Sequence, residues 1–421
     1  MGAQDAEPEP RDTSGRHTRM LSQPACGADD PCRVSYTLFG MSLPRLGCGL
    51  FVLLLVASRA QQKAPATGTP GPAKAPPAAA PARATTTAAP KTKAIWEPVN
   101  VKDDLKLLSI RFVSPDEGWA AGGRDELHGG VILHTKDGGA TWEAQLGNSK
   151  SNEPAYTDLR MLSATTGWAT QGSPGGQDKL LRTNDGHSWA QVGGLPQRHL
   201  AYTFTSENNG FVLYGRQILR SLDGGRNWRS AYRCSVKYAV KGVAQESFCE
   251  FESISFLNDA VGFALSREID RGAGSVLART MDGGTTWDAS VILPGQNGKE
   301  SSIWFTTERH GLIRMSDGKL FYTDDGGKAW TAAAGLADGR PEVQFAGANV
   351  GWAVRNRAMT YTTDGGKHWL TRLLPFLGIV SAASLVSPER GYVAGEHGIV
   401  YRYRVAPLNY VSKGMLPAPA L

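Results

Sequence analysis

Five arginines are the residues of this sequence best suited to binding chemistry. A guanidinium group is permanently charged and carries a planar fork of N–H donors, so it binds carboxylates in a bidentate manner. Arginines from several loops therefore predict a site for an acidic or carboxylate-bearing partner segment, provided that the fold brings them to one surface. The alternative is a solvated rim without a ligand. These arginines are Arg216, Arg267, Arg271, Arg355 and Arg357.

Carboxylates on such loops would suit a different chemistry, the hydrolysis of a glycosidic bond. That reaction needs two facing Asp or Glu side chains. The sequence does not exclude such a pair among Asp125, Glu126, Asp270, Asp317 and Glu396. A sialidase would also need an Arg-Ile-Pro-like segment, whereas Ile110-Arg111-Phe112 has only the pattern of a strand. A carbohydrate-binding protein is a further alternative with Trp304 as a sugar platform, although we expect Trp304 to pack in the core. The histidines have no Ser or Cys partner motif, and we predict no catalytic residue.

Two of the five cysteines, Cys234 and Cys249, lie in the part of the chain that is expected to fold. A bond between them would close a loop of about 15 residues, worth ~3 kcal/mol in the chain-entropy model. We predict this disulfide because exported compartments permit disulfides and the chain carries an export signal. Two cysteines without nearby histidine do not make a zinc site. The sequence therefore predicts neither a metal nor a cofactor.

A turn motif that ends in tryptophan occurs six times. One copy is Thr-Met-Asp-Gly-Gly-Thr-Thr-Trp, which ends at Trp287, and the copy ending at Trp189 is one residue shorter. Successive motif tryptophans are 47, 39, 59, 43 and 39 residues apart, which is the period of a four-stranded propeller blade. The motif is the Asp-box, in which Gly-Gly permits positive φ and the Asp can accept hydrogen bonds from turn amides. We predict a structural role for its aspartates, Asp137, Asp185, Asp223, Asp282, Asp325 and Asp364.

A second marker, glycine followed by an aromatic or apolar residue, precedes each Asp-box and occurs a seventh time at Gly391-Tyr392. Alternating apolar residues around each marker predict four strands per unit, A to D. The last unit lacks strand D, and residues 95–99 resemble one. The sequence thus predicts an all-β fold, a seven-bladed β-propeller over residues 95–405 in which an N-terminal strand completes the last blade and removes the open sheet edge.

The predicted strand order divides the loops between two faces. The A–B turns and the Asp-box turns lie on one face, called the Asp-box face below. The B–C and D–A loops lie on the other, called the B–C face. The five arginines belong to the B–C face, and nearby D–A loops add further basic residues, so we expect this face to be the more basic one. Our hypothesis is that its arginines converge to hold a partner segment.

Asp-boxes joined to Gly-Trp-Ala-x-Gly strands in seven units resemble the photosystem II stability/assembly factor family of exported propellers. The Asp-box alone also occurs in sialidases, xyloglucanases and sortilin-type receptors. Members of the family in photosynthetic organisms bind an early reaction-centre subunit and help to assemble the membrane complex. The resemblance implies a non-catalytic, monomeric scaffold that binds a membrane-protein subunit or its acidic segment. The Ala/Pro/Thr-rich linker and the enlarged fourth unit depart from the family pattern.

The first 94 residues predict export rather than a folded unit. Residues 1–40 are a disordered leader or an over-extended start before Met41. Residues 41–60 predict a signal peptide with an apolar run at 46–57 and a small-x-small cleavage pattern at Ala60. The apolar run is short for a membrane span, and a tether through an uncleaved signal is the alternative. Residues 61–94 form a linker and 406–421 a tail, so we expect a periplasmic or extracytoplasmic protein without an integral span in its mature chain.

Composition and charge exclude several classes of protein. The chain has 50 Gly and 24 Pro among 421 residues, a globular composition diluted by linker-like sequence, which is neither wholly disordered nor collagen-like. Its 45 Lys+Arg and 39 Asp+Glu give a net charge of +6. This mild excess is far from the dense basic footprint of a nucleic-acid binder, and no nucleic-acid partner is predicted.

Overall fold

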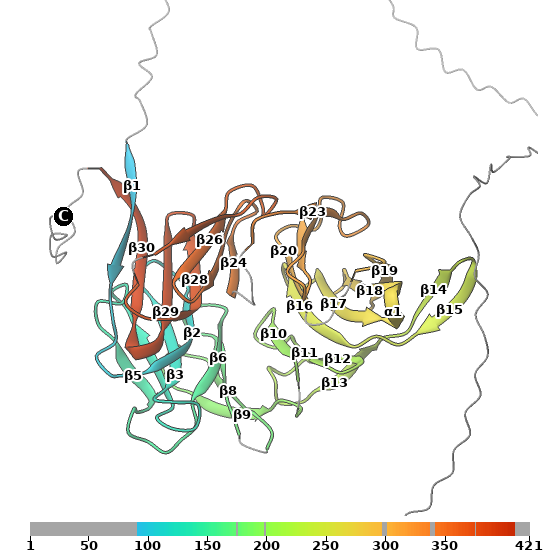
Figure 1. The fold of residues 1–421 in the computed structure, drawn as a ribbon. Coiled ribbons are helices and arrows are strands. Elements are labelled where there is room, and N and C mark those ends of the chain that lie inside the picture. The colour runs from blue at the N-terminus through green and yellow to red at the C-terminus, as the bar shows by residue number, and fades with distance from the viewer. Residues whose placement is uncertain are drawn as a thin grey trace, which may run out of the picture. The chain divides into compact units, whose positions relative to one another are not determined.

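Seven antiparallel sheets of four strands each form the predicted seven-bladed propeller (Figure 1). The computed structural model describes residues 91–173, 176–197, 199–296, 301–336, 342–374 and 376–408. The predicted leader and signal peptide, and most of the predicted linker and tail, lie outside these described residues. Neither helix in the described residues is long and apolar enough to cross a bilayer.

Blades 1 to 6 take their strands in chain order from the ring centre outward, and the inner strands of most neighbouring blades pack against one another. Blade 1 contains β2 (Lys106–Phe112), β3 (Gly118–Gly123), β4 (Val131–Thr135) and β5 (Glu143–Gly147). Blade 2 contains β6 (Tyr156–Met161), β7 (Gly167–Gln171), β8 (Lys179–Thr183) and β9 (Ala190–Gly194). Blade 3 contains β10 (Ala201–Phe204), β11 (Gly210–Tyr214), β12 (Gln217–Ser221) and β13 (Arg229–Arg233). Blade 4 contains β16 (Phe251–Phe256), β17 (Gly262–Ile269), β18 (Gly274–Thr280) and β19 (Asp288–Ile292).

The remaining blades follow the same pattern, except that the last is built from both ends of the folded region. Blade 5 contains β20 (Ser302–Phe305), β21 (Gly311–Arg314), β22 (Leu320–Thr323) and β23 (Thr331–Ala333). Blade 6 contains β24 (Glu342–Ala346), β25 (Val350–Arg355), β26 (Ala358–Thr362) and β27 (Leu370–Leu373). Blade 7 contains β28 (Val380–Ser387), β29 (Arg390–Gly395), β30 (Val400–Pro407) and β1 (Thr92–Pro98).

Three short elements lie outside this pattern. An extra hairpin of β14 (Val236–Val240) and β15 (Val243–Ser247) lies between blades 3 and 4 and projects from the ring (Figure 1). Two short helices, α1 (Asp270–Ala273) and the 3₁₀ helix η1 (Glu396–Gly398), occupy the B–C connections of blades 4 and 7. The hairpin accounts for the widest spacing between Asp-box tryptophans, from Trp228 to Trp287.

The ring closes through β1, as predicted. This strand pairs antiparallel with β30 from Thr92↔Pro407 to Pro98↔Tyr401. Trp96 of β1 packs against Trp352 of blade 6, with ring centroids 5.5 Å apart. The two ends of the propeller are therefore held in one sheet, and blade 7 has no missing outer strand.

At four of the seven Gly-aromatic markers, the aromatic residue stacks on a ring of the neighbouring blade. Phe263, which follows Gly262 in β17, stacks on Phe305 of blade 5 with ring centroids 3.5 Å apart. A Cβ atom on Gly262 would lie 2.4 Å from the ring of Phe256 at the end of β16. Only glycine fits beneath that ring, because real Cβ contacts are not this short. The glycine of the marker is therefore required because the aromatic side chain at the end of strand A lies directly over the first residue of strand B.

The Asp-box turns have the geometry expected of a structural motif. Asp282 accepts hydrogen bonds from the backbone N–H of Thr286 at 2.9 Å and from its hydroxyl at 2.6 Å. Gly283 and Gly284 have φ of +69° and +79°, a region that favours glycine. The other five aspartates likewise accept a backbone N–H from two to four residues later; they are Asp137, Asp185, Asp223, Asp325 and Asp364.

Candidate functional site

The arginines singled out by sequence lie at B–C connections, in two groups. Arg216, Arg267 and Arg271 belong to blades 3 and 4 beside the extra hairpin, and only the backbone of Arg271 is described. Arg355 and Arg357 belong to the turn between β25 and β26 of blade 6. Among the described residues, no hydrogen bond or ion pair links the two groups. Convergence of all five on one ligand stays a prediction.

The arginines beside the hairpin have partners of their own. Arg267 Nη1 lies 3.0 Å from a carboxylate oxygen of Glu250, and its Nε lies 3.3 Å from one of Glu252. The guanidinium carbon of Arg216 lies 4.9 Å above the ring of Phe248, a cation–π arrangement that leaves the exposed side chain its charge. An acidic ligand at this group would therefore bind to Arg216, because the charge of Arg267 is already compensated by Glu250 and Glu252.

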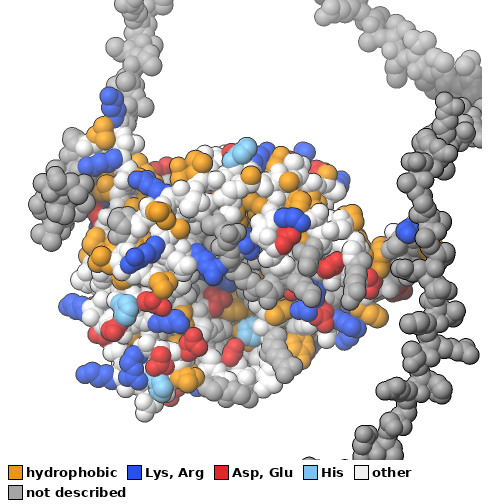
Figure 2. Space-filling model, viewed as in Figure 1, with side chains coloured by type: hydrophobic (Ala, Val, Ile, Leu, Met, Phe, Trp, Pro, Cys, Tyr) orange, Lys and Arg blue, Asp and Glu red, His pale blue; other side chains and the backbone are white. Residues whose placement is uncertain are grey.

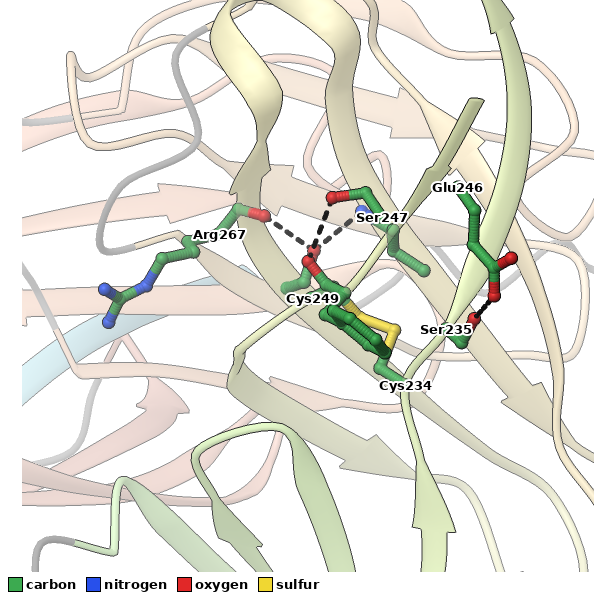
Figure 3. Close-up of a disulfide and its surroundings, with 9 residues drawn as sticks. Cys234, Ser235, Glu246, Ser247, Cys249 and Arg267 are labelled. Atoms are coloured by element: carbon green, nitrogen blue, oxygen red, sulfur yellow. Dashed lines mark hydrogen bonds between the residues drawn. A yellow bond between two sulfur atoms is a disulfide. The ribbon is translucent and has the colours of Figure 1, made fainter. Parts of the chain in front are cut away.

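Cys234 and Cys249 are joined at the base of the extra hairpin (Figure 3). Their Cα atoms are 5.4 Å apart, and both residues are buried. Cys234 N–H donates to the carbonyl of Arg216 at 2.9 Å, so the base of the hairpin is bonded to the B–C turn of blade 3. Figure 3 shows the guanidinium of Arg267 directed away from the two sulfur atoms. The pair fixes the hairpin to the ring at the point where Arg216 is presented.

The arginines of blade 6 lie on a turn without acidic neighbours in sequence. Residues 343–388 contain a single acidic residue, Asp364 of the Asp-box. Arg355 and Arg357 are both exposed, and Asn356 between them has a φ of +56° that turns the chain tightly. The Arg357 guanidinium donates to the carbonyl of Leu377 at 2.9 Å, and the Arg357 carbonyl accepts from Leu374 N–H at 3.1 Å. The turn is therefore bonded to the D–A loop of its own blade.

Part of the B–C face carries charges of both signs. A cavity of about 570 Å³ lies at the B–C connections of blades 1 and 2. Its lining combines the apolar side chains of Leu108 and Leu127 with the carboxylates of Glu126 and Asp178. Glu126 also forms an ion pair with Lys106 at 3.2 Å. The cavity is therefore a part of this face where carboxylates accompany the basic residues.

Sequence reasoning did not recognise that seven inner-strand residues form a set that the register makes equivalent. Each is paired with the aromatic or apolar residue of a Gly-aromatic marker, so it occupies the same position on the innermost strand of its blade. Arg111 Nη1 donates to the carbonyl of Ala383 at 3.0 Å, and Gln344 donates to the same oxygen at 2.5 Å. Their fixed offset before each marker was the sequence signal that would have identified them. They are Arg111, Arg160, Thr203, Ser255, Trp304, Gln344 and Ser384.

The carboxylates considered for hydrolysis lie on the B–C connections of blades 1, 4, 5 and 7, and Asp125 and Glu126 share the connection of blade 1. Asp125 accepts the backbone N–H groups of Leu127 and His128, and the former contact is the main cause of its lowered pKa. The hydrogen bond from Lys319 lowers the pKa of Asp317. A general acid needs a raised pKa, so these two shifts run against that role. Trp304 is half-buried and packs against the core cluster between blades 5 and 6, the arrangement expected in place of a sugar platform.

Charges of both signs are intermixed over the side of the ring seen in Figure 2, without a continuous field of one sign. The described residues contain no group of three or more His, Cys, Asp or Glu side chains that could hold a metal ion. The described part of the chain forms a closed ring with exposed loops. Ring and turns together define a seven-bladed propeller of the Asp-box class.

Comparison with known proteins identifies the family within this class. The chain belongs to the family described as photosynthesis system II assembly factor YCF48, whose profile matches residues 88–199 and 194–341. A solved structure of YCF48 bound to a D1 peptide is 20% identical, with a TM-score of 0.53 over 73% of this chain and 96% of that one. YCF48 from Cyanidioschyzon merolae is 19% identical, with a TM-score of 0.52 over 73% and 98% of the two chains. No curated protein sequence matches the chain.

Proposed function

We propose that this protein is an exported, non-catalytic scaffold that binds a protein partner and assists the assembly or stability of a membrane-associated complex. The partner is a membrane-protein subunit or an acidic segment of one, and the scaffold acts as a monomer. Membership of the YCF48 family supports this function. A structure of the same fold with a D1 peptide bound gives a precedent for a peptide ligand on such a ring.

The observation that carries the proposal is the exposure of guanidinium groups from different blades on the B–C face of a closed ring. Arg216 of blade 3 and Arg355 and Arg357 of blade 6 are exposed. The ring holds their backbones in place, so binding does not require the loops to order themselves, and a preorganised surface loses less entropy on association. Exposed forks of this kind suit carboxylates of an extended segment.

Export, with a tether if the signal is not cleaved, is part of this proposal, and one structural feature supports it. The signal-like segment at 41–60 predicts a periplasmic or extracytoplasmic location, with a membrane tether if the segment is not cleaved. The joined cysteines Cys234 and Cys249 fit an oxidising compartment. Thiols with this geometry in a reducing compartment would stay unpaired.

Capture from membranes tests the proposal. The tagged chain is expressed in its own host, crosslinked, and isolated from solubilised membranes, and its partners are identified by mass spectrometry. We expect a membrane-protein subunit that is lost or strongly reduced in Arg216→Glu or in the pair Arg355→Glu, Arg357→Glu. Lys328→Glu, an exposed residue of the blade 5 Asp-box on the opposite face, is the matched control and should retain the partner. Recovery of the same subunit by all four proteins would refute binding through the arginines, and recovery of glycans alone would refute the scaffold.

A further inference from the structure

The outer strand and the following loop of blade 6 expose leucine side chains that the ring does not need for its core. Leu373 is 81% exposed and Leu377 is 80% exposed, and Ile379 is 44% exposed. Leu370, at the start of the same strand, is 60% exposed. Large apolar side chains exposed side by side on a folded protein usually mark an interaction surface.

These leucines are held outward by a well-anchored loop. Leu374 and Phe376, their neighbours in sequence, are only 7% and 3% exposed and belong to the core between blades 6 and 7. The loop is bonded to the B–C turn through Leu374 N–H and through the carbonyl of Leu377. Because Leu374 and Phe376 already fill the core beneath this loop, Leu373 and Leu377 cannot both turn inward without removing core residues.

The same position in other blades shows that exposed leucine is specific to blade 6. Leu370 directly follows an Asp-box tryptophan. Its equivalents are all exposed as well, but none of them is a large apolar residue. They are Glu143, Ala190, Arg229, Asp288 and Thr331. The apolar character therefore does not follow from the repeat.

Cations surround this apolar tip. Arg355 and Arg357 project from the adjoining turn, and Arg372 is exposed between Leu370 and Leu373 on β27. Apart from Asp364, at the opposite end of β26 and β27, residues 343–388 carry no acidic side chain. Glu342, which pairs with Val354, and Glu396, whose N–H donates to the carbonyl of Ile379, are the carboxylate residues of the adjoining strand and loop, against the three arginines. Leucines that protrude among an excess of arginines match an anionic lipid surface, since apolar side chains enter the acyl boundary while cations contact the head groups.

We propose that this blade 6 tip, formed by Leu373, Leu377, Ile379, Arg355, Arg357 and Arg372, docks the propeller on an anionic phospholipid bilayer. Docking turns the B–C face toward the membrane, which is where a segment of a membrane-protein partner emerges. The inference rests on the proposed function only in placing the B–C face beside a membrane-protein partner. Lipid binding itself needs no protein partner, so the two proposals fail separately.

The test uses the full-length chain and protein-free vesicles, with hydrogen–deuterium exchange as a local measure. Vesicles of phosphatidylcholine with about a third phosphatidylglycerol are compared with pure phosphatidylcholine. We expect amides of residues 370–379 to become protected with the anionic vesicles alone. If the apolar run at 46–57 also enters the bilayer, it does so in every variant, and protection of the tip still reports docking.

Paired variants separate docking from general adhesion. We expect Leu373→Ser with Leu377→Ser to abolish the local protection, and Arg355→Gln with Arg357→Gln to weaken the anionic preference by roughly ten- to thirty-fold. Leu222→Ser removes a leucine that is 67% exposed on an Asp-box turn and should change nothing. Circular dichroism checks that each variant is folded. If the leucine double variant does not fold, the arginine double variant tests the proposal by itself. Equal protection in wild type and both pairs, absence of protection, or protection only on addition of a membrane protein would overturn it.

Discussion

Glu97 and Arg402 form an ion pair across the seam where the two ends of the propeller meet. The carboxylate oxygen Oε2 of Glu97 in β1 lies 3.1 Å from Nη2 of Arg402 in β30, 305 residues away in sequence. The other oxygen of Glu97 lies 2.5 Å from Nη2 of Arg404. Glu97 is only 7% exposed, so its charge depends on these two guanidinium groups. Arg402 Nη1 also donates to the carbonyl of Gly138, which links the seam to the Asp-box of blade 1.

Replacing Glu97 by glutamine should weaken ring closure. The substitution Glu97→Gln keeps the shape but leaves two partly buried guanidinium groups without their carboxylate. We expect the free energy of unfolding to fall by about 2–3 kcal/mol, measured by urea denaturation. Glu143→Gln, at the equivalent position of blade 1, removes an exposed carboxylate and should cost less than about 0.5 kcal/mol. Equal losses in the two variants would show that the seam does not depend on this charge.

The Gly-aromatic markers predict a second stability effect. A methyl group at residue 262 would overlap the ring of Phe256, which itself stacks on Phe211 with centroids 4.3 Å apart. Gly262→Ala should therefore destabilise the protein by about 1–3 kcal/mol through displacement of that ring. In Gly172→Ala the added Cβ meets nothing within 4 Å, and its melting temperature should match that of wild type. An unchanged melting temperature in Gly262→Ala would mean that the interface between blades 3 and 4 can relax around the methyl group.

The ring could be predicted from sequence because every blade carries its own local signals. The Asp-box and the Gly-aromatic marker each report contacts made within a few residues or with the adjacent blade, and their repetition fixed the number of blades. The environment of the arginines could not be predicted in this way. Arg267 is neutralised by Glu250 and Glu252, which follow the inserted hairpin, and no repeat governs that region.

The apolar tip of blade 6 was missed for a different reason. The stretch from Leu373 to Val380 is apolar almost throughout, so it has no alternation to distinguish side chains that face solvent from those in the core. The structure makes the distinction through anchors from other segments, such as Tyr401, whose hydroxyl accepts the backbone N–H of Leu377 at 3.3 Å. Comparison of Leu370 with its equivalents in the other outer strands, none of which is a large apolar residue, was the available sequence signal.

Pairing of the two cysteines predicts a local change on reduction. The hairpin between Cys234 and Cys249 contains the trypsin sites Lys237 and Lys241, both exposed. We expect oxidised protein to resist cleavage there, and reduced protein or Cys234→Ser with Cys249→Ser to be nicked at these lysines while the ring stays folded. The loop closed by the bond is 15 residues long, which corresponds to ~3 kcal/mol in the chain-entropy model. Limited proteolysis with mass spectrometry measures the effect, and identical digestion patterns with and without reductant would contradict a structural bond.

The Asp-box aspartates predict a loss of stability in acid. The hydroxyl and backbone N–H of Thr286 lower the pKa of Asp282 from 3.8 to about 2. Since the folded state binds this proton less readily than the unfolded chain, the contribution is fully present above about pH 4 and disappears as the pH falls through about 2. We expect urea midpoints of the wild type to fall over that interval, with a shallower fall in Asp282→Asn, whose amide does not titrate. Asp288→Asn, an exposed aspartate on β19 with the same change in net charge, should retain the wild-type pH dependence. A parallel fall in all three proteins would show that the acid sensitivity does not arise from the blade 4 Asp-box.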